Sequence, residues 1–358
     1  MCLTDDCLLY TGSEKAYPYA QQAKPCPRGH NLQVEGDNGG PLFMKIITEN
    51  VEQREAISVE YETRALTLIV DDENNDRVVG LVVRQNQQEL NVRARQGVIL
   101  CAGGFVMNQE MVRKYAPMLT AGTEPIGNPG DTGTGILMGI SVGGAAINMH
   151  EGFISLPYYP PASMTKGIVI NDKGQRFINE DVYHGRLGAF ALRQQSQRIY
   201  FILTVDQYGD YERVSYLGAQ VAGTGETVEE LEEELGLREG TLQQTLQVYN
   251  EDCARGEDSI CHKAAEWLEP LEPPLVALDI TPGRGAFVPF FTLGGLDTLP
   301  TGEVVDAERE IIPGLYAAGR TACGVVRRAE GYSSGMSVGD ASFSGRLAGR
   351  QAAAAARD

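Results

Sequence analysis

The sequence has no paired cysteine motif and no long apolar run. Its 7 cysteines are odd in number and include no Cys-x-x-Cys pair, which argues against a disulfide framework or a zinc site and predicts reduced thiols. No run of eighteen apolar residues occurs, so no transmembrane helix is expected. The first twenty residues also lack the basic and apolar parts of a secretory signal. We therefore expect a cytoplasmic protein without a metal site.

Positive charge is scarce as well. The chain has 30 Lys and Arg residues against 48 Asp and Glu residues, which gives a formal net charge of -18. Nucleic acids and anionic membranes bind through basic surfaces, so neither is expected as a partner. With 358 residues, of which 42% are hydrophobic, the chain is long enough for two domains with a sizeable core.

The sequence also lacks the usual dinucleotide motif, because no Gly-x-Gly-x-x-Gly follows a predicted strand. Glycine itself is abundant, with 42 residues. Near the C-terminus a predicted buried strand over 314–319 leads through a loop into a helix that contains Gly335, Gly339, Gly345 and Gly349. Each helical glycine costs about 1 kcal/mol relative to alanine. Such a cost usually reflects close approach of the helix to another backbone or to a ligand.

The first turn of this helix, Gly335-Met-Ser-Val338, would present free N–H groups and a partial positive charge. That end suits an anionic or carbonyl-rich ligand.

Three stretches of this region resemble a known family. They are Gly-Leu-Tyr-Ala-Ala-Gly-Arg at 314–320, Gly-Tyr-Ser-Ser-Gly-Met-Ser at 331–337 and Phe-Ser-Gly-Arg-Leu-Ala-Gly-Arg at 343–350. They resemble the C-terminal FAD segment of the fumarate reductase/succinate dehydrogenase flavoprotein superfamily, most closely its 3-ketosteroid dehydrogenase branch. The Arg-Phe-Ile-Asn-Glu stretch at 176–180 is similar to a motif found across that superfamily.

The resemblance implies an α/β fold with an α+β insert, namely an incomplete Rossmann-like FAD-binding domain with an inserted substrate-capping domain. The expected divisions are 1–104 for the later part of the FAD-binding domain, 105–285 for the capping domain and 286–358 for the C-terminal FAD segment. It also implies FAD as the cofactor. The residues that match FAD-contacting positions are Ala102, Gly103, Asp131, Gly133, Gly319, Arg320, Gly335, Met336, Ser337 and Val338.

The resemblance covers nearly all of the chain but only the later part of the family's architecture. We therefore expect either a truncated chain or a partner chain that supplies the missing nucleotide-binding unit.

Local patterns predict the individual elements. Helices are expected at 42–50, 108–115, from the 127–135 loop to 145, 228–235 and 242–253. Strands are expected at 56–63, 65–70, 77–83, 90–94 and 97–104, with two more strands and a turn within 167–180.

Oxidation of a CH–CH bond next to a ketone requires a base for the proton alpha to the carbonyl, an acceptor for hydride from the beta carbon, and donors to the ketone oxygen. The resemblance implies that Tyr332 and Tyr183 act as acid and base. Ser334 would serve as a hydroxyl relay, and the N–H of Gly335 would complete an oxyanion hole. A free phenol has a pKa of about 10, so a tyrosine base needs a relay or a nearby positive charge. Arg186 is a candidate for that charge.

Two of these predictions have ordinary structural alternatives. Tyr183 could equally be an ordinary half-buried aromatic residue. His184 beside it could relay a proton or could simply be hydrogen-bonded.

The predicted substrate is a small apolar, steroid-like ketone, and the sequence does not identify the electron acceptor. The predicted substrate-binding residues are Arg176, Glu180, Arg186, Tyr158 and Phe291.

Two alternatives remain open from the sequence. One is a fumarate reductase-like dicarboxylate enzyme: the 324–332 loop lacks the His-Gly-x-Asn-Arg dicarboxylate site of that branch, although Arg327 and Arg328 could bind carboxylates. The other is a truncated, non-catalytic paralogue that serves as a partner subunit.

Overall fold

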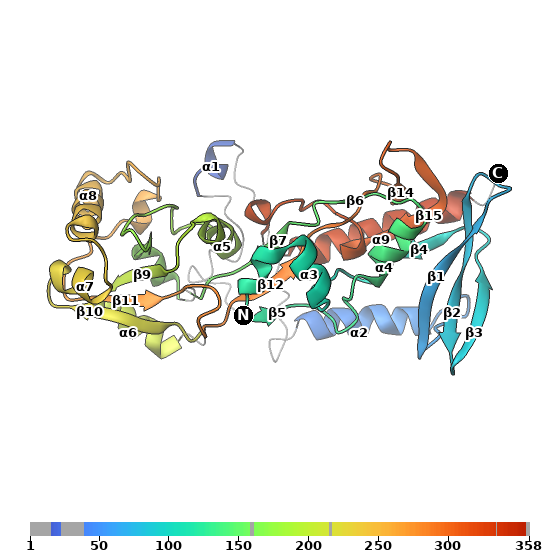
Figure 1. The fold of residues 1–358 in the computed structure, drawn as a ribbon, viewed down its shortest axis with the longest axis horizontal. Coiled ribbons are helices and arrows are strands. Elements are labelled where there is room, and N and C mark those ends of the chain that lie inside the picture. The colour runs from blue at the N-terminus through green and yellow to red at the C-terminus, as the bar shows by residue number, and fades with distance from the viewer. Residues whose placement is uncertain (1–15, 23–38, 158–160, 215–216, 334, 356–358) are drawn as a thin grey trace.

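The structure is a computed structural model that describes residues 16–22, 39–157, 161–214, 217–333 and 335–355. Figure 1 shows an elongated molecule with a different kind of sheet at each end. One end consists of residues 39–154 and 286–355, which we call the FAD lobe. The other end is built from residues 156–280, which we call the capping lobe.

A three-stranded antiparallel sheet forms the outer end of the FAD lobe. It contains β1 (Thr63–Asp71), β2 (Arg77–Gln85) and β3 (Gln88–Arg93), in that order. These strands confirm the predictions at 65–70, 77–83 and 90–94. The strand predicted at 56–63 is wrong. Residues 54–62 form turns and irregular backbone, and Ile57, Val59 and Tyr61 are exposed, because no element covers the apolar side of their alternating pattern.

The FAD lobe contains a second sheet. Its order is β14 (Glu303–Val305), β15 (Ile311–Ala317) and β4 (Val98–Leu100), and β15 runs parallel to β4. Helix α9 (Met336–Ala354) packs on β15 and β4, while α4 (Thr134–Ser141) contacts β4 and β1. Helix α2 (Gly39–Glu52) confirms the helix predicted at 42–50 but buries none of its residues.

Short elements link the two lobes. Strand β12 (Pro289–Thr292) lies between β5 (Glu124–Pro125) and β7 (Gly152–Ile154), and β13 (Gly295–Leu296) pairs with β6 (Ala146–Ile147). The remaining helices here are α1 (Tyr19–Gln22), α3 (Gln109–Tyr115) and the 3-10 turns η2 (Pro117–Ala121), η5 (Gly319–Thr321) and η6 (Ala329–Gly331). Helix α3 matches the helix predicted at 108–115, with Asn108 as its N-cap.

The capping lobe is a four-stranded antiparallel sheet with helices on both faces. Its order is β10 (Gln220–Gly225), β11 (Leu275–Asp279), β9 (Ile199–Thr204) and β8 (Ile168–Asn171). One face packs against α5 (His184–Arg193) and α6 (Val205–Val214), and the other against α7 (Val228–Glu234) and α8 (Thr241–Arg255). Two further 3-10 turns are η3 (Ala162–Lys166) and η4 (Ala265–Trp267). Because both faces are covered, β9 and β11 are apolar and almost wholly buried.

The strand predicted after the turn at 172–174 is reduced to a single bridge between Ile170 and Arg176. The helices predicted at 228–235 and 242–253 are confirmed by α7 and α8.

The hydrophobic cores divide the chain differently from the predicted domain boundary at 105. Buried residues between Phe105 and Ile154 belong to one core with Val98, Leu100 and Leu315 of the FAD lobe. Two other cores contain most of the buried apolar residues from Leu156 to Ile280, joined by Ala16, whereas Tyr183 and Ala189 belong to the first core. This packing favours a capping unit that begins near residue 155.

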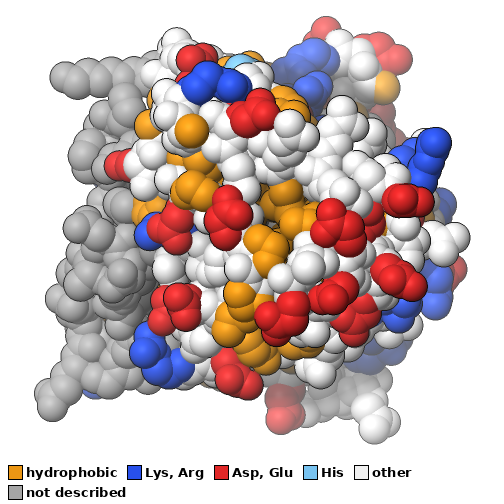
Figure 2. Space-filling model, turned by 90° about the vertical axis from the view of Figure 1, so that its left-hand side faces the viewer, with side chains coloured by type: hydrophobic (Ala, Val, Ile, Leu, Met, Phe, Trp, Pro, Cys, Tyr) orange, Lys and Arg blue, Asp and Glu red, His pale blue; other side chains and the backbone are white. Residues whose placement is uncertain are grey.

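The surface of the capping lobe is acidic. Figure 2 looks onto this end of the molecule, where Asp and Glu side chains are spread among small apolar patches. Such a face repels polyanions, as expected from the net charge. Among the helices that the structure describes, none combines the length and the apolar character needed to cross a bilayer.

Candidate active site

The two tyrosines predicted to be catalytic lie in one aromatic cluster between the lobes. The ring centroids of Tyr183 and Tyr332 are 6.1 Å apart. Phe153 of β7 and Phe291 of β12 stack with their centroids 4.6 Å apart. Tyr332 contacts both of these phenylalanines, at 5.0 and 5.2 Å. The cluster thus brings the predicted residues Tyr183, Tyr332 and Phe291 together, and adds Phe153.

Close packing of α5 on β7 places Tyr183 in this cluster. Tyr183 is the N-cap residue of α5 and is buried. A Cβ atom at Gly188 of the same helix would collide with the backbone carbonyl of Ile154 in β7. Only glycine allows the helix to lie this close to the strand. Tyr183 is therefore held 6.2 Å from the Phe153 ring, measured between centroids.

The hydroxyl of Tyr332 has a partner in the first turn of α9. The Tyr332 Oη and Ser337 Oγ atoms are 3.1 Å apart, and either can be the donor. The predicted relay residue, Ser334, lies outside the described residues. Sequence reasoning placed Ser337 at the cofactor and missed this contact with Tyr332. The five-residue spacing across a loop and a helix start gives no periodic signal that could have revealed it.

His184 and Arg186 follow Tyr183 on α5. Desolvation by burial lowers the pKa of His184 to about 4, so its imidazole is neutral at pH 7. One guanidinium nitrogen of Arg186 lies 3.0 Å from the hydroxyl of Tyr19. The Arg186 guanidinium also lies over the rings of Tyr19 and Phe190, at 5.2 and 4.7 Å. These interactions hold the Arg186 guanidinium against Tyr19 and Phe190.

The residues predicted to contact FAD converge from three segments. Ala102 and Gly103 follow β4, and the hydroxyl of Thr321 donates to the Gly103 carbonyl at 3.0 Å. The loop before α4 brings the buried Asp131 under Gly103, where a Cβ atom would collide with the Asp131 carboxylate. Gly103 has φ +77, and Gly133, the N-cap of α4, has φ +78. Glycine is favoured at both positions because this region strains other residues.

The third segment forms a pocket at the start of α9. Four of the predicted FAD contacts, Gly319, Arg320, Met336 and Ser337, line one pocket of about 100 Å³. Gly335 caps α9 in the left-handed conformation, with φ 81. Gly335 itself makes no side-chain capping bond, and the N–H of Met336, the first residue of the helix, donates to the Ser333 carbonyl at 3.3 Å. Val338 is 56% exposed on the same turn.

Arg320 connects this pocket to the aromatic cluster. Its guanidinium lies 4.4 Å from the centroid of the Phe291 ring. Burial lowers the pKa of Arg320, and the nearby Asp131 carboxylate acts in the opposite direction. This region combines the start of α9, the Arg320 cation and the exposed residue Ala102. Such a combination suits an anionic or carbonyl-rich cofactor, and therefore fits FAD.

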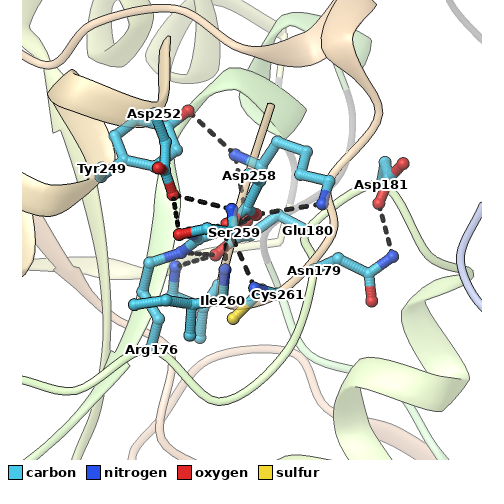
Figure 3. Close-up of polar contacts among 12 residues, drawn as sticks. Arg176, Asn179, Glu180, Asp181, Tyr249, Asp252, Asp258, Ser259, Ile260 and Cys261 are labelled. Carbon is cyan, nitrogen blue, oxygen red and sulfur yellow. Dashed lines mark hydrogen bonds and ion pairs between the residues drawn. The ribbon is translucent and has the colours of Figure 1, made fainter. Parts of the chain in front are cut away.

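Arg176 and Glu180 lie elsewhere, in a buried ion-pair cluster of the capping lobe (Figure 3). Arg176 bonds to both carboxylate oxygens of Glu180 and both of Asp258, at 2.8–3.2 Å. Lys263 adds an ion pair to Glu180 at 3.0 Å and lies 5.0 Å from the Tyr249 ring centroid. These charges satisfy one another and are shielded from solvent. The placement argues against the predicted substrate contacts and favours a structural role.

The remaining predicted residues are Tyr158, which lies outside the described residues, and the candidate carboxylate ligands Arg327 and Arg328, which are both exposed. The Arg327 guanidinium lies 4.0 Å from the carboxylate of Asp297, to which Arg309 also bonds. This carboxylate partly neutralises the positive charge of the loop before Tyr332.

Comparisons with known proteins agree with this geometry. The family model for an FAD binding domain matches residues 26–335. Among curated proteins, a probable fumarate reductase of Shewanella frigidimarina is 27% identical over 90% of this chain and 55% of its own length. A 3-oxosteroid 1-dehydrogenase of Mycobacterium tuberculosis is 29% identical over 76% of this chain and 56% of its own length. The chain thus spans little more than half the length of these relatives.

Two solved structures are also similar. The 3-ketosteroid-Δ4-(5α)-dehydrogenase of Rhodococcus jostii, in complex with 4-androstene-3,17-dione, has a TM-score of 0.87 and 39% identity, covering 96% of this chain and 71% of that one. The 3-ketosteroid Δ1-dehydrogenase of Sterolibacterium denitrificans has a TM-score of 0.65 and 26% identity, covering 84% of this chain and 60% of that one.

Proposed function

Since the chain belongs to the FAD-binding flavoproteins of the fumarate reductase/succinate dehydrogenase superfamily, we propose that it oxidises a CH–CH bond next to a ketone, as a 3-ketosteroid dehydrogenase does. The observation that carries the proposal is the pairing of Tyr183 with Tyr332, at 6.1 Å between ring centroids. Both rings belong to an aromatic cluster that Arg320 joins to the predicted FAD pocket.

The proposed site holds FAD between the β4 end, the Asp131 loop and the start of α9. Bound FAD supplies the two-electron acceptor for the hydrogen that leaves the beta carbon. The residues proposed to hold it are those that converge there, namely Ala102, Gly103, Asp131, Gly133, Gly319, Arg320, Gly335, Met336, Ser337 and Val338.

The proton chemistry falls to the tyrosine pair. One tyrosine gives up its phenolic proton and, as the phenolate, takes the proton alpha to the carbonyl. The other, with the N–H of Gly335, donates to the ketone oxygen, where negative charge develops. The electrons of the alpha C–H bond form the new C=C bond, while the beta hydrogen leaves as hydride with the electron pair of its own bond. The contact between Tyr332 and Ser337 fixes the phenol and offers a path for its proton.

An apolar ketone is the favoured substrate class. Phe153 and Phe291 present a stacked apolar wall beside both tyrosines. The competing dicarboxylate function needs cations that are free to bind the substrate. Arg327 lies 4.0 Å from the Asp297 carboxylate, which also pairs with Arg309, while Arg328 is exposed and stays a candidate ligand. Because fumarate reductases are among the relatives, the dicarboxylate function is the alternative that the substrate assay must test.

The FAD lobe also supports the proposal of a partner unit. Helix α2 exposes Met44 and Ile46, α9 exposes Val338 and Phe343, and among the strands that the structure describes β4 lies at the edge of its sheet. Apolar surface of this kind, beside an open strand edge, is typical of a protein contact. We propose that a nucleotide-binding unit covers it.

The substrate assay compares a saturated 3-ketosteroid with succinate, using an artificial electron acceptor and added FAD. We expect turnover with the steroid, and turnover at least about a hundredfold slower after Tyr332→Phe. Turnover with succinate alone would move the chain to the dicarboxylate branch. Turnover with neither, in a chain that retains flavin, would contradict the proposal.

A further inference from the structure

A set of contacts outside the aromatic cluster holds the turn that leads to Tyr332. This turn is η6, whose central residue is Glu330. The Arg193 guanidinium, at the end of α5, makes an ion pair with the Glu330 carboxylate at 3.0 Å. The Tyr19 hydroxyl donates to the Glu330 backbone carbonyl. Side chain and backbone of Glu330 are therefore held from two different segments.

The Tyr19 contact is itself anchored on α5. Arg186 donates to the Tyr19 hydroxyl at 3.0 Å, and its guanidinium lies 5.2 Å from the Tyr19 ring centroid. The segment before Tyr19 is docked on the capping lobe as well. Ala16 is buried, and the ring of Tyr17 lies 4.4 Å from that of His262. Tyr19 thus reaches η6 from a fixed position.

Helix α5 is therefore linked to both tyrosines. It begins directly after Tyr183 and ends at Arg193, which holds Glu330, two residues before Tyr332. We propose that Tyr19, Arg193 and Glu330 form a clamp that sets the position of Tyr332 relative to Tyr183. Only the effect of this clamp on catalysis depends on the proposed function. Tyr19 and Arg193 are positioning residues in this proposal.

The size of the effect follows from the nature of the contacts. An exposed ion pair and a neutral hydrogen bond each contribute only a small part of the folding stability of a domain. Neither controls the stability of the fold. A misplacement of about 1 Å in a catalytic group, however, can lower a rate about a hundredfold. The clamp should therefore affect turnover more than stability.

The test uses the full chain with Tyr19→Phe, Arg193→Gln and the double variant. Tyr19→Phe removes the hydroxyl and leaves the ring over Arg186. The matched controls are Tyr208→Phe, which removes an exposed hydroxyl contact with Glu212, and Arg198→Gln, which removes a capping-lobe ion pair with Asp279. Arg193→Lys should restore most of what Arg193→Gln loses.

Amide hydrogen exchange tests the clamp without any assay of activity. The amides of Gly331 and Tyr332 bond within η6 and its flanks, to the carbonyls of Arg328 and Ala329. We expect several-fold faster exchange at residues 329–332 in the double variant and unchanged exchange in the controls. Unchanged exchange in a folded double variant would overturn the proposal.

Turnover measurements test whether the clamp affects catalysis. With a 3-ketosteroid we expect kcat to fall about tenfold in the double variant, with KM changed less than twofold, because the clamp acts on Tyr332 and not on the substrate. If the unmodified chain has no such turnover, the proposed function fails while the exchange result still decides the clamp. Faster exchange with unchanged kcat would overturn the positioning role.

Discussion

Tyr183 and Tyr332 come from different lobes of the chain, yet their ring centroids lie 6.1 Å apart. Tyr183 is fixed by the contact of α5 with β7, and Tyr332 by the loop that enters α9. In the proposed site, the substrate lies against Phe153 and Phe291 and meets both hydroxyls. This relationship underlies the proposed acid–base chemistry.

The first prediction concerns the tyrosine pair itself. Tyr332→Phe and Tyr183→Phe each keep the ring and its aromatic contacts but remove the hydroxyl. We expect kcat with a 3-ketosteroid to fall at least about a hundredfold, the usual contribution of a general acid or base. Steady-state kinetics measure this, with flavin content determined for each variant. Tyr61→Phe, at an exposed position, should keep full activity. Activity retained by either site variant would remove that tyrosine from the mechanism.

The second prediction concerns Gly103. Its backbone φ of +77 disfavours other residues, and a Cβ atom would meet the Asp131 carboxylate. Gly103→Ala should therefore weaken FAD binding at least about tenfold, since it displaces the Asp131 loop, which is proposed to face the cofactor. Gly143→Ala is the matched control: Gly143 also has positive φ, at +94, but no atom lies within 4 Å of its added Cβ. It should cost only about 1 kcal/mol of backbone strain. Titration of flavin fluorescence distinguishes the two, and equal affinities in both variants would refute the role of Gly103.

Sequence reasoning predicted several elements of the FAD lobe because their signals are local. The small residues of α9, the hairpin strands and the glycines after β4 each follow from a short pattern. The exposed 56–63 segment shows the limit of such patterns, because alternation indicates a strand only where another element covers the apolar side.

Long-range contacts explain what the sequence could not reveal. Arg176 and Glu180 are four residues apart and looked like a substrate motif, but their other partners, Asp258 and Lys263, are distant in sequence. Likewise, no pattern near Glu330 indicates that Arg193 of the capping lobe will hold it.

The third prediction addresses the buried ion pairs. Glu180→Gln leaves Arg176 and Lys263 with one carboxylate fewer in a site without solvent. Removing one partner of a buried pair costs about 3–5 kcal/mol. Asp210→Asn, which breaks the exposed pair with Arg213, should cost less than about 1 kcal/mol. Urea denaturation of both variants measures the difference. Equal stabilities would show that the cluster does not support the capping lobe.

The fourth prediction is a pH dependence from His184. Its pKa is lowered to about 4 in the folded chain, whereas an unfolded histidine titrates near 6.5. The unfolded chain therefore binds more protons between these values, so the free energy of unfolding falls as pH decreases from 6.5 to 4. His184 contributes at most about 3 kcal/mol to this fall. His184→Gln should reduce the slope, whereas His150→Gln, at an exposed position, should not. The same slope in all three proteins would contradict the assignment.

The central claim is that this chain passes hydrogen from a ketone substrate to FAD at the tyrosine pair. The most direct measurement is an anaerobic mixing experiment on the FAD-loaded chain, in which the visible flavin band is followed after adding a saturated 3-ketosteroid. We predict that the band bleaches with the steroid, persists with succinate, and bleaches at least about a hundredfold more slowly after Tyr332→Phe. A flavin that stays oxidised with the steroid, or bleaches equally fast in the variant, would contradict the account.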